Sequence, residues 1–179
     1  MEYREMRSDE IKRISEVKRE EIINYVYTTK CDDTGFGLVT TCVEKSPPGV
    51  EPPWGEKGVE HRINNWKPSL QQGGCMYGAF DNDRLVGFVI LGPKREDNSG
   101  EIVAIFIDKD YRRIGIAGKL MKWAEKKAKS LEMESLFLYS NPTGSAMGFY
   151  LNQGFRIVGL ISKEIVRSLP GDIVMAKKI

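Results

Sequence analysis

The sequence is poor in the residues that build metal centres and disulfide frameworks. It contains one histidine, His61, and three widely spaced cysteines among 179 residues, with no C-x-x-C pair. Because transition metals are held mainly by clusters of cysteine and histidine, this composition argues against a metal site. It also argues against catalysis by a nucleophile paired with His61, which we interpret as a solvated or capping residue of a polar helix. Free thiols are typical of a reducing compartment.

Long apolar runs and a strong charge imbalance are also missing. The longest apolar stretches, LVGFVIL (85–91) and IVAIFI (102–107), have the length of strands, whereas a membrane-spanning helix needs about 20 residues. The charged N-terminal segment does not resemble a signal peptide. A net charge of +2 is small for a nucleic-acid-binding protein, and the lysines between 119 and 129 fit a solvated helix face. We therefore expect a cytoplasmic protein without membrane or nucleic-acid partners.

The residues that are present predict one globular α/β domain. Hydrophobic residues make up 41% of the chain and charged residues 29%, which is ordinary for a folded domain of this length. We expect a short strand over 1–7, a helix from Ser8 to about 28, a turn-rich segment over 30–56, and a helix over 57–72 bent at Pro68. The apolar stripe of the first helix comprises Ile11, Ile14, Val17, Ile22 and Val26.

From residue 75 onward, strands and helices follow one another closely. The turn signal DND separates two apolar runs and predicts a hairpin. One apolar face over 116–131 predicts a helix, and Gly154 suits the end of another. The expected strands are 75–80, 85–91, 101–108, 135–139, 155–161 and 172–177, and the expected helices are 116–131 and 144–153.

The segment DYRRIGIAGKLMKW (110–123) lies between a predicted strand and a predicted helix. It does not match a phosphate-binding P-loop, because Arg113 stands where the first glycine is needed and Leu120 replaces the hydroxyl residue. It does not match the dinucleotide fingerprint either, since Ala117 and Leu120 occupy glycine positions. The pattern that remains is R-x-x-G-x-A, carried by Arg112, Gly115 and Ala117.

This pattern predicts an anion site at the start of a helix. Small residues at 115, 117 and 118 let the backbone approach a ligand closely. The free N–H groups of the first helical turn, together with the helix dipole, favour a negative charge. Arg112, Arg113 and Lys119 are available to add side-chain charge. The alternative is an ordinary helix start that carries arginines by chance.

A second motif lies about thirty residues further on. The segment SNPTGSAMGFYLNQGF (140–155) contains A-x-x-F-Y-x-x-x-G-F, with Tyr150 at its centre. Together with the R-x-x-G-x-A loop, it resembles the Gcn5-related N-acetyltransferases (the GNAT superfamily). The resemblance covers residues 75–160, and residues 1–74 only in the order of their helices. This sequence has Arg113 where the family commonly has glycine, and Lys109 where proline is common.

The resemblance implies a GNAT-like fold. This is a mixed, mostly antiparallel central sheet of about six or seven strands flanked by about four helices. The strands at 101–108 and 135–139 would splay apart. Within a single acetyltransferase domain over 1–179, residues 1–74 would form the N-terminal, acceptor-side region, 75–160 the coenzyme-binding core, and 161–179 the closing strand.

The resemblance also implies acetyl-coenzyme A as the acetyl donor, with no metal. Backbone groups of Ile105 and Ile107 would contact the pantetheine arm in the splay, and amides of residues 112–118 would hold the pyrophosphate. Asn141 would contact the coenzyme from the end of the next strand. The implied coenzyme-binding residues are Ile105, Ile107, Arg112, Arg113, Gly115, Ile116, Ala117, Gly118, Lys119, Asn141 and Tyr150.

The chemistry of acetyl transfer asks for a base and an acid. An amine attacks only when neutral, and an alkylamine has a pKa of about 10.4, so a general base is useful near neutral pH. Glu101 stands eleven residues before Arg112, where a branch of the family has its catalytic glutamate. Asp81, Asp83 or an ordered water are alternatives. Tyr150 matches the family's proton donor to the leaving thiolate, and otherwise packs as an aromatic residue. The backbone N–H of Ile107 would stabilise the charge that develops on the carbonyl oxygen.

The acceptor is not decided by these motifs. A small amine competes with a protein lysine or N-terminal amine, and direct attack through a ternary complex is expected in either case. A non-catalytic module that binds acyl-coenzyme A is the alternative function. Trp54 and Trp66 either line an acceptor pocket or pack in the core, and the proline-rich segment 46–55 could close over a small acceptor. A homodimer is left open.

Overall fold

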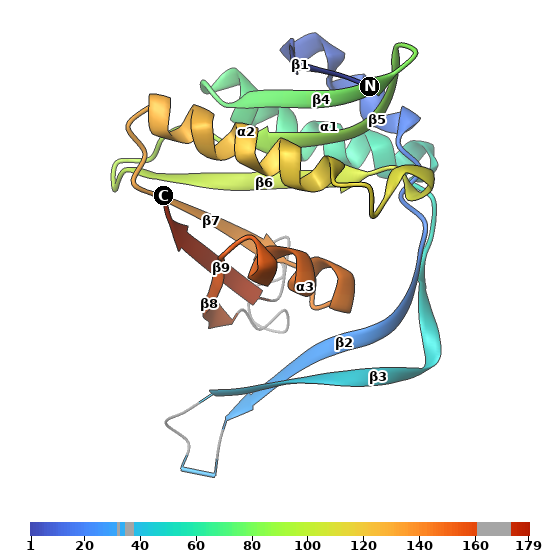
Figure 1. Cartoon of the computed structure of the whole chain (residues 1–179), viewed down its shortest axis with the longest axis vertical. Helices are drawn as coiled ribbons and strands as arrows, with labels where there is room; N and C mark the ends of the chain where they lie inside the picture. Colours follow the sequence, from blue (N-terminus) through green and yellow to red (C-terminus); the bar gives the residue numbers. More distant parts are fainter. Residues whose placement is uncertain (32, 35–37, 161–172) are drawn as a thin grey trace. The chain divides into compact units, whose positions relative to one another are not determined.

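A computed structural model describes residues 1–31, 33–34, 38–160 and 173–179 (Figure 1). These residues form two compact units. The first unit consists of Met1–Glu20, Pro52–Leu138 and Ala176–Ile179, and the second of Glu21–Glu51 and Tyr139–Met175.

The main sheet has seven strands in the order β1-β4-β5-β6-β7-β9-β8. Neighbours from β1 to β6 are antiparallel, whereas β6 and β7 are parallel. This mixed, mostly antiparallel sheet confirms the predicted fold class. The strands are β1 (Glu2–Met6), β4 (Cys75–Asp81), β5 (Arg84–Leu91), β6 (Ser99–Ile107), β7 (Ser135–Ser140), β8 (Arg156–Leu160) and β9 (Ile173–Lys178).

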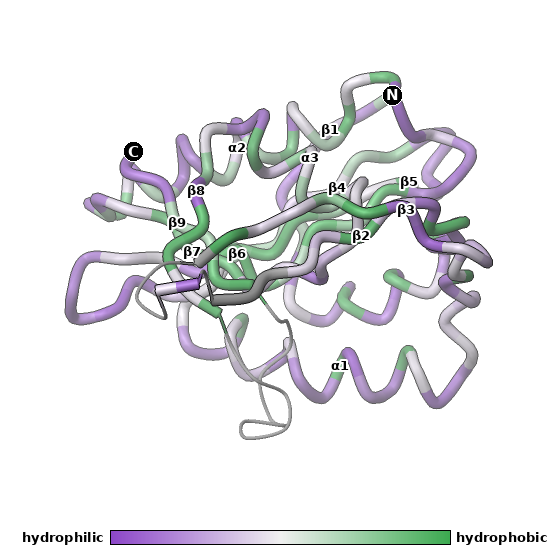
Figure 2. The backbone as a smooth tube through the Cα atoms, turned by 90° about the horizontal axis from the view of Figure 1, so that it is seen from below, coloured by the Kyte–Doolittle hydropathy of each residue, from purple (hydrophilic) through white to green (hydrophobic). Residues whose placement is uncertain are grey.

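In the first unit, helices cover both faces of the sheet. The short 3-10 helix η1 (Ser8–Glu16) and α1 (Gly55–Gln71) pack on one face, and α2 (Ile116–Ser130) lies on the other (Figure 1). The chain of α1 alternates between hydrophilic and hydrophobic residues, while β5 and β6 are hydrophobic (Figure 2). The core on the α1 face includes Met6, Ile11, Ile14, Val17, Trp54, Trp66, Leu70, Phe80, Phe88 and Ile90.

The prediction of one helix from Ser8 to about 28 is wrong. The 3-10 helix ends at Glu16, and a strand, β2 (Glu21–Cys31), follows after four residues. The apolar residues Ile11, Ile14 and Val17 are buried as the helical stripe required. Ile22, in contrast, is 67% exposed on β2. The run of β-branched and aromatic residues after residue 20 favours a strand over a helix.

The segment predicted to be turn-rich contains a second long strand. In the second unit, β3 (Leu38–Glu51) pairs with β2 in an antiparallel two-stranded sheet. The register shifts between Ile23 and Tyr25, so that residues 45–48 fall opposite a single residue of β2. Because Pro47 and Pro48 lack an N–H group, they fit in such a bulge outside the ladder.

The remaining elements lie close to their predicted positions. Helix α1 contains Pro68, and the hairpin of β4 and β5 turns at Asn82 and Asp83, which both have positive φ. Helix α3 (Gly144–Asn152) ends before Gly154, whose φ is 88°. Residues 161 and 172, at the ends of the two predicted closing strands, lie outside the described residues.

Candidate functional site

The end of β6 is fixed by a buried carboxylate. The side chain of Asp108 has no solvent exposure. It accepts hydrogen bonds from the backbone N–H groups of Lys18 and Asp110, each at 3.0 Å, and forms an ion pair with Arg84. These contacts end the strand and begin the short helix η2 (Lys109–Tyr111). Asp108 therefore sets the direction in which the chain enters the R-x-x-G-x-A loop.

The side chain of Arg112 is used within the protein. Its guanidinium donates to the carbonyl oxygens of Ile107 at 3.2 Å, Glu20 at 3.1 Å and Arg19 at 2.8 Å. These bonds fasten the loop to the end of β6 and to the segment after η1. The expectation that the Arg112 side chain adds charge to an anion site therefore differs from the observed arrangement.

The loop itself has the backbone of an open helix start. Arg113 and Gly115 have positive φ values of 64° and 87°, and α2 begins directly after Gly115. The first helical bond runs from the N–H of Lys119 to the carbonyl of Gly115, at 3.2 Å. The N–H groups of the three preceding residues, Ile116, Ala117 and Gly118, thus have no acceptor within the helix.

The two glycines of this helix start have open space around them. A Cβ atom built on Gly115 or Gly118 would meet no described heavy atom within 4 Å. Among the described residues, no side chain caps the helix. Arg113 is exposed and forms no ion pair with any described residue, while the Lys119 ammonium lies 5.2 Å from the centre of the Tyr3 ring. The helix start has the open backbone that an anion site requires, and the anion site itself stays a prediction.

The strand that leads into the loop has one open edge. The ladder between β6 and β7 comprises three pairs among the described residues, from Ser99–Ser135 to Glu101–Phe137. Beyond Glu101, β6 continues for six residues without a described partner on β7. This early end of the ladder matches the predicted splay.

The register with β5 shows which backbone groups face that edge. Asp108 donates its N–H to Val86 at 2.8 Å. Hydrogen-bonded and non-bonded pairs alternate along an antiparallel ladder, so the pairs of Ile107 with Gly87 and Ile105 with Val89 are non-bonded ones. The N–H and C=O groups of Ile105 and Ile107 therefore point away from β5, toward the open edge. The bond from Arg112 to the carbonyl of Ile107 agrees with this direction.

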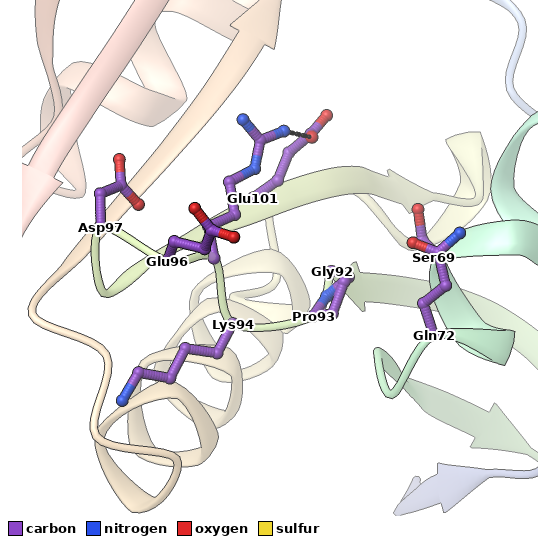
Figure 3. A pocket seen from close by; sticks show the side chains of 9 residues that line it. Ser69, Gln72, Gly92, Pro93, Lys94, Glu96, Asp97 and Glu101 are labelled. Atoms are coloured by element: carbon purple, nitrogen blue, oxygen red, sulfur yellow. Dashed lines mark hydrogen bonds and ion pairs between the residues drawn. The ribbon is translucent and has the colours of Figure 1, made fainter.

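Glu101 lies where the ladder with β7 stops. Its side chain is 20% exposed and lines a pocket of about 600 Å³ between the β5–β6 loop and the end of α1 (Figure 3). Burial raises the pKa of the carboxyl, and the nearby Arg95 guanidinium opposes that shift without cancelling it. The Arg95 guanidinium donates to one carboxylate oxygen of Glu101 at 2.9 Å. The pocket is lined by Ser69, Gln72, Gly92, Pro93, Lys94, Arg95, Glu96, Asp97 and Glu101.

The alternative carboxylates are engaged elsewhere. Asp81 accepts the hydroxyl proton of Tyr111 at 2.7 Å. Asp83 lies in the β4–β5 turn, 89% exposed, and pairs with Arg13 at 3.5 Å. Neither lines the pocket that contains Glu101.

In the second unit, α3 holds Tyr150. The helix begins at Thr143, whose hydroxyl accepts the N–H of Ala146. The Tyr150 ring packs against Phe149 and Phe155, with ring centres 5.3 and 5.8 Å apart. Burial raises the pKa of the Tyr150 hydroxyl, so the group stays protonated throughout the neutral range. Asn141, before the helix, is exposed.

Two tryptophans that could have lined a pocket belong to the core. Trp66 is 5% exposed and Trp54 9%, and both rings pack against Phe106. The indole N–H of Trp54 donates to the carbonyl of Val17 at 2.8 Å. Trp54 also lines part of a second pocket, next to the first residues of α1.

Sequence reasoning missed Asp108 and Arg95. Asp108 has a weak signal, since it is a single acidic residue directly after an apolar strand. Arg95 precedes Glu101 by six residues in a hairpin loop, and only the register of β5 and β6 brings the two together.

The described residues contain no group of three or more histidine, cysteine, aspartate or glutamate side chains placed to hold a metal ion. No described helix has both the length and the apolar character needed to cross a membrane.

Comparison with solved structures shows the fold. Nourseothricin acetyltransferase superposes with a TM-score of 0.78 at 18% identity, covering 99% of this chain and 97% of that one. A putative streptothricin acetyltransferase from Bacillus anthracis str. Ames, solved with acetyl coenzyme A, gives 0.75 at 20% identity and covers 99% of both chains.

Sequence comparison shows the family. Probable N-acetyltransferase 14 from Xenopus tropicalis is 27% identical over 92 residues, which are 51% of this chain and 45% of that protein. The chain thus matches just under half the length of this curated relative. The model of the acetyltransferase (GNAT) family matches residues 39–155, more than half of the chain and the range that includes both motifs. The protein therefore belongs to the acetyltransferase (GNAT) family.

Proposed function

We propose that the protein transfers an acetyl group from acetyl-coenzyme A to a primary amine, by direct attack within a ternary complex. The observation that carries the proposal is the run of outward backbone groups on β6, at Ile105 and Ile107, followed by the N–H groups at the start of α2. It combines a strand edge without a described partner on β7 beyond Glu101 with a helix start without a described side-chain cap. A diphosphate and an amide-containing arm are the groups that such a run would bind.

In this proposal, the chain's own backbone holds the donor. The N–H groups of Ile116, Ala117 and Gly118 bind the pyrophosphate, with Arg113 and Lys119 beside it. The outward groups of Ile105 and Ile107 pair with the pantetheine arm as an added strand would. Six residues of β6 separate Glu101 from Ile107, about 20 Å at 3.3 Å per residue. The thioester end of the arm thus comes toward Glu101.

The coenzyme supplies the acetyl thioester, and Glu101 acts on the acceptor. The amine nitrogen forms a bond to the acetyl carbon, its proton passes to the Glu101 carboxylate, and the carbon–sulfur bond breaks. The raised pKa of Glu101 makes it a better base than an exposed glutamate. The N–H of Ile107 is about 20 Å along β6 from Glu101, too far to donate to the carbonyl oxygen during this attack, contrary to the expectation from the sequence.

Tyr150 is the proposed acid and Asn141 a proposed coenzyme contact. The departing thiolate would take its proton from the Tyr150 hydroxyl, which burial keeps protonated. Family membership supports both assignments, because the matched range 39–155 includes Tyr150 in the second motif and Asn141 shortly before it. Ordered water is the alternative to Glu101 as the base.

The acceptor that we propose is a small amine. The pocket beside Glu101 has a volume of about 600 Å³, within the range of sites for small molecules. Its wall is mostly polar or charged. A protein lysine or N-terminal amine remains the competing acceptor.

The proposal is tested by binding and turnover together. Acetyl-coenzyme A is titrated into the protein by calorimetry, and thiol release is followed with a panel of small amines and lysine peptides. Gly118→Asp places a carboxylate before the loop N–H groups and should weaken coenzyme binding at least tenfold. The matched control is Gly58→Asp, near the start of α1, where a Cβ also meets nothing within 4 Å. Coenzyme binding without turnover on any acceptor would favour the non-catalytic module.

A further inference from the structure

Arg95 occupies a small cation site at the end of the β6–β7 ladder. Glu101 and Phe137 are the last pair of that parallel ladder, so their side chains leave the same face of the sheet side by side. The Arg95 guanidinium bonds to the Glu101 carboxylate at 2.9 Å, and its central carbon lies 4.3 Å from the centre of the Phe137 ring. A carboxylate next to an aromatic face is a general recognition unit for organic cations.

The guanidinium reaches this unit from a solvent-exposed loop. The Arg95 side chain is 50% exposed, although its backbone is tied by bonds to Ser99 and Asn98. An exposed ion pair of this kind is weak, so the side chain can leave without unfolding the loop. The Glu101 carboxylate, at 20% exposure, stays in place on β6. The receiving site is thus more rigid than its present occupant.

We propose that Arg95 stands in for the acceptor, and that the acceptor's alkylammonium group displaces it to bind between Glu101 and Phe137. The proposal rests on the proposed function, since it assigns the acceptor site of that same reaction. It names the acceptor class as a cationic primary alkylamine and makes Phe137 and Arg95 determinants of specificity. Arg95 then acts as an intramolecular competitor. A small guanidinium compound should compete for the same site.

The first experiment separates competition from orientation. Arg95→Met removes the charge and keeps much of the length. If Arg95 competes with the acceptor, KM for n-butylamine falls about fivefold to tenfold while kcat stays within about twofold. If Arg95 instead orients Glu101, kcat falls and KM does not, which overturns the proposal. The control is Arg7→Met, because Arg7 pairs with Asp9 on the surface, with 77% of its side chain exposed.

The second experiment needs no acetyl transfer. Phe137→Trp is combined with Arg95→Met, and tryptophan fluorescence is titrated with methylguanidinium chloride or n-butylammonium chloride at constant ionic strength. The Arg95→Met protein serves as the baseline for the native tryptophans. We expect a saturable fluorescence change in the double variant. The apparent affinity for the cation should be at least fivefold weaker in the single Phe137→Trp variant, which retains Arg95. No saturable change in the double variant overturns the proposal.

The two readouts distinguish this inference from the proposed function. Saturable cation binding without turnover on any amine supports the cation site and contradicts the transferase. Turnover with an unchanged KM in Arg95→Met contradicts the cation site and leaves the transferase intact. If circular dichroism shows that Phe137→Trp is unfolded, Phe137→Leu replaces it. That variant should raise KM for n-butylamine about fivefold, and an unchanged KM would count against the proposal.

Discussion

At the scale of single residues, the Glu101 carboxylate experiences two opposing influences. Burial raises its pKa above the ordinary 4.5, and the Arg95 guanidinium lowers it, with burial the larger effect. The acid therefore titrates closer to neutrality than an exposed glutamate does. A base in this position loses activity as the pH falls through its raised pKa.

Replacing Glu101 tests that role directly. Glu101→Gln should lower kcat/KM about 100-fold or more, because a positioned base contributes about 100-fold to 10,000-fold. The wild-type rate should decline on the acid side at a pH above 4.5, and this decline should be absent in the variant. A pH series of kcat/KM with acetyl-coenzyme A and an amine measures both. Asp83→Asn is the control for the loss of a carboxylate, and a similar loss of rate there would exclude a specific role.

Tyr150 makes a separate prediction. Tyr150→Phe should lower kcat about 10-fold to 100-fold with little change in KM, since it removes a proton donor and keeps the ring. Burial raises the pKa of the hydroxyl above its ordinary 10.0, so ionisation of Tyr150 should cause no loss of wild-type activity between pH 7 and about 10. Steady-state kinetics across that range check it. Tyr77→Phe, on β4, serves as the control, and an unchanged Tyr150→Phe would leave only a packing role.

The positions of the candidate site residues were easier to predict from the sequence than the contacts that their side chains make. The spacing of Arg112, Gly115 and Ala117 correctly located the helix start. The direction of the Arg112 side chain depends on carbonyl groups about 90 positions earlier in the chain, at Arg19 and Glu20. No local pattern encodes such a contact. The ion pair of Arg95 with Glu101 was missed for the same reason.

At the scale of elements, the loop before α2 contains two left-handed residues, Arg113 and Gly115. Gly115 has φ of 87° and ψ of 2°, a conformation that costs a residue with a Cβ atom about 1–2 kcal/mol. Gly118 lies inside the helix, where a Cβ meets nothing within 4 Å. Substitution of the two glycines by alanine should therefore change the stability of the protein in opposite directions.

Alanine substitutions separate the two cases. Gly115→Ala should lower the free energy of unfolding by about 1–2 kcal/mol, because the native backbone is strained for alanine. Gly118→Ala should raise it by about 0.5–1 kcal/mol, because alanine is the better helix former. Urea denaturation followed by circular dichroism measures both. Equal effects at the two positions would contradict the difference in backbone conformation.

Elements were predictable where periodicity was unambiguous. Helix α2 has one apolar face at helical spacing, and strand β5 is an unbroken apolar run of strand length. The predicted bounds of both agree with the structure to within one residue. The apolar residues after residue 16 also fit a helical stripe, although the β-branched and aromatic residues after residue 20 favour a strand. Pairing with β3, from Cys31 with Leu38 to Glu21 with Glu51, decides for the strand. The spacing of the apolar residues alone could not settle that choice.

At the scale of the whole molecule, the residues proposed to bind acetyl-coenzyme A belong to different compact units. The loop residues from Arg112 to Lys119 belong to the first unit, whereas Asn141 and Tyr150 belong to the second. All three tryptophans, at 54, 66 and 123, lie in the first unit. Tryptophan fluorescence therefore follows the unfolding of the first unit alone, while far-ultraviolet circular dichroism follows both.

Acetyl-coenzyme A should stabilise the molecule through both units. At a ligand concentration of 100 Kd, stabilisation is about 2.7 kcal/mol, which for a chain of this size corresponds to a rise in Tm of about 5–10 °C. If the coenzyme contacts both the loop and the Tyr150 segment, the midpoint temperatures measured by fluorescence and by circular dichroism should rise by the same amount and coincide. A rise only in the midpoint temperature measured by fluorescence would restrict the coenzyme contacts to the first unit. An unchanged fluorescence midpoint at saturation would contradict the proposed role of the helix start, because ligand bound there must raise the stability of the unit that forms it.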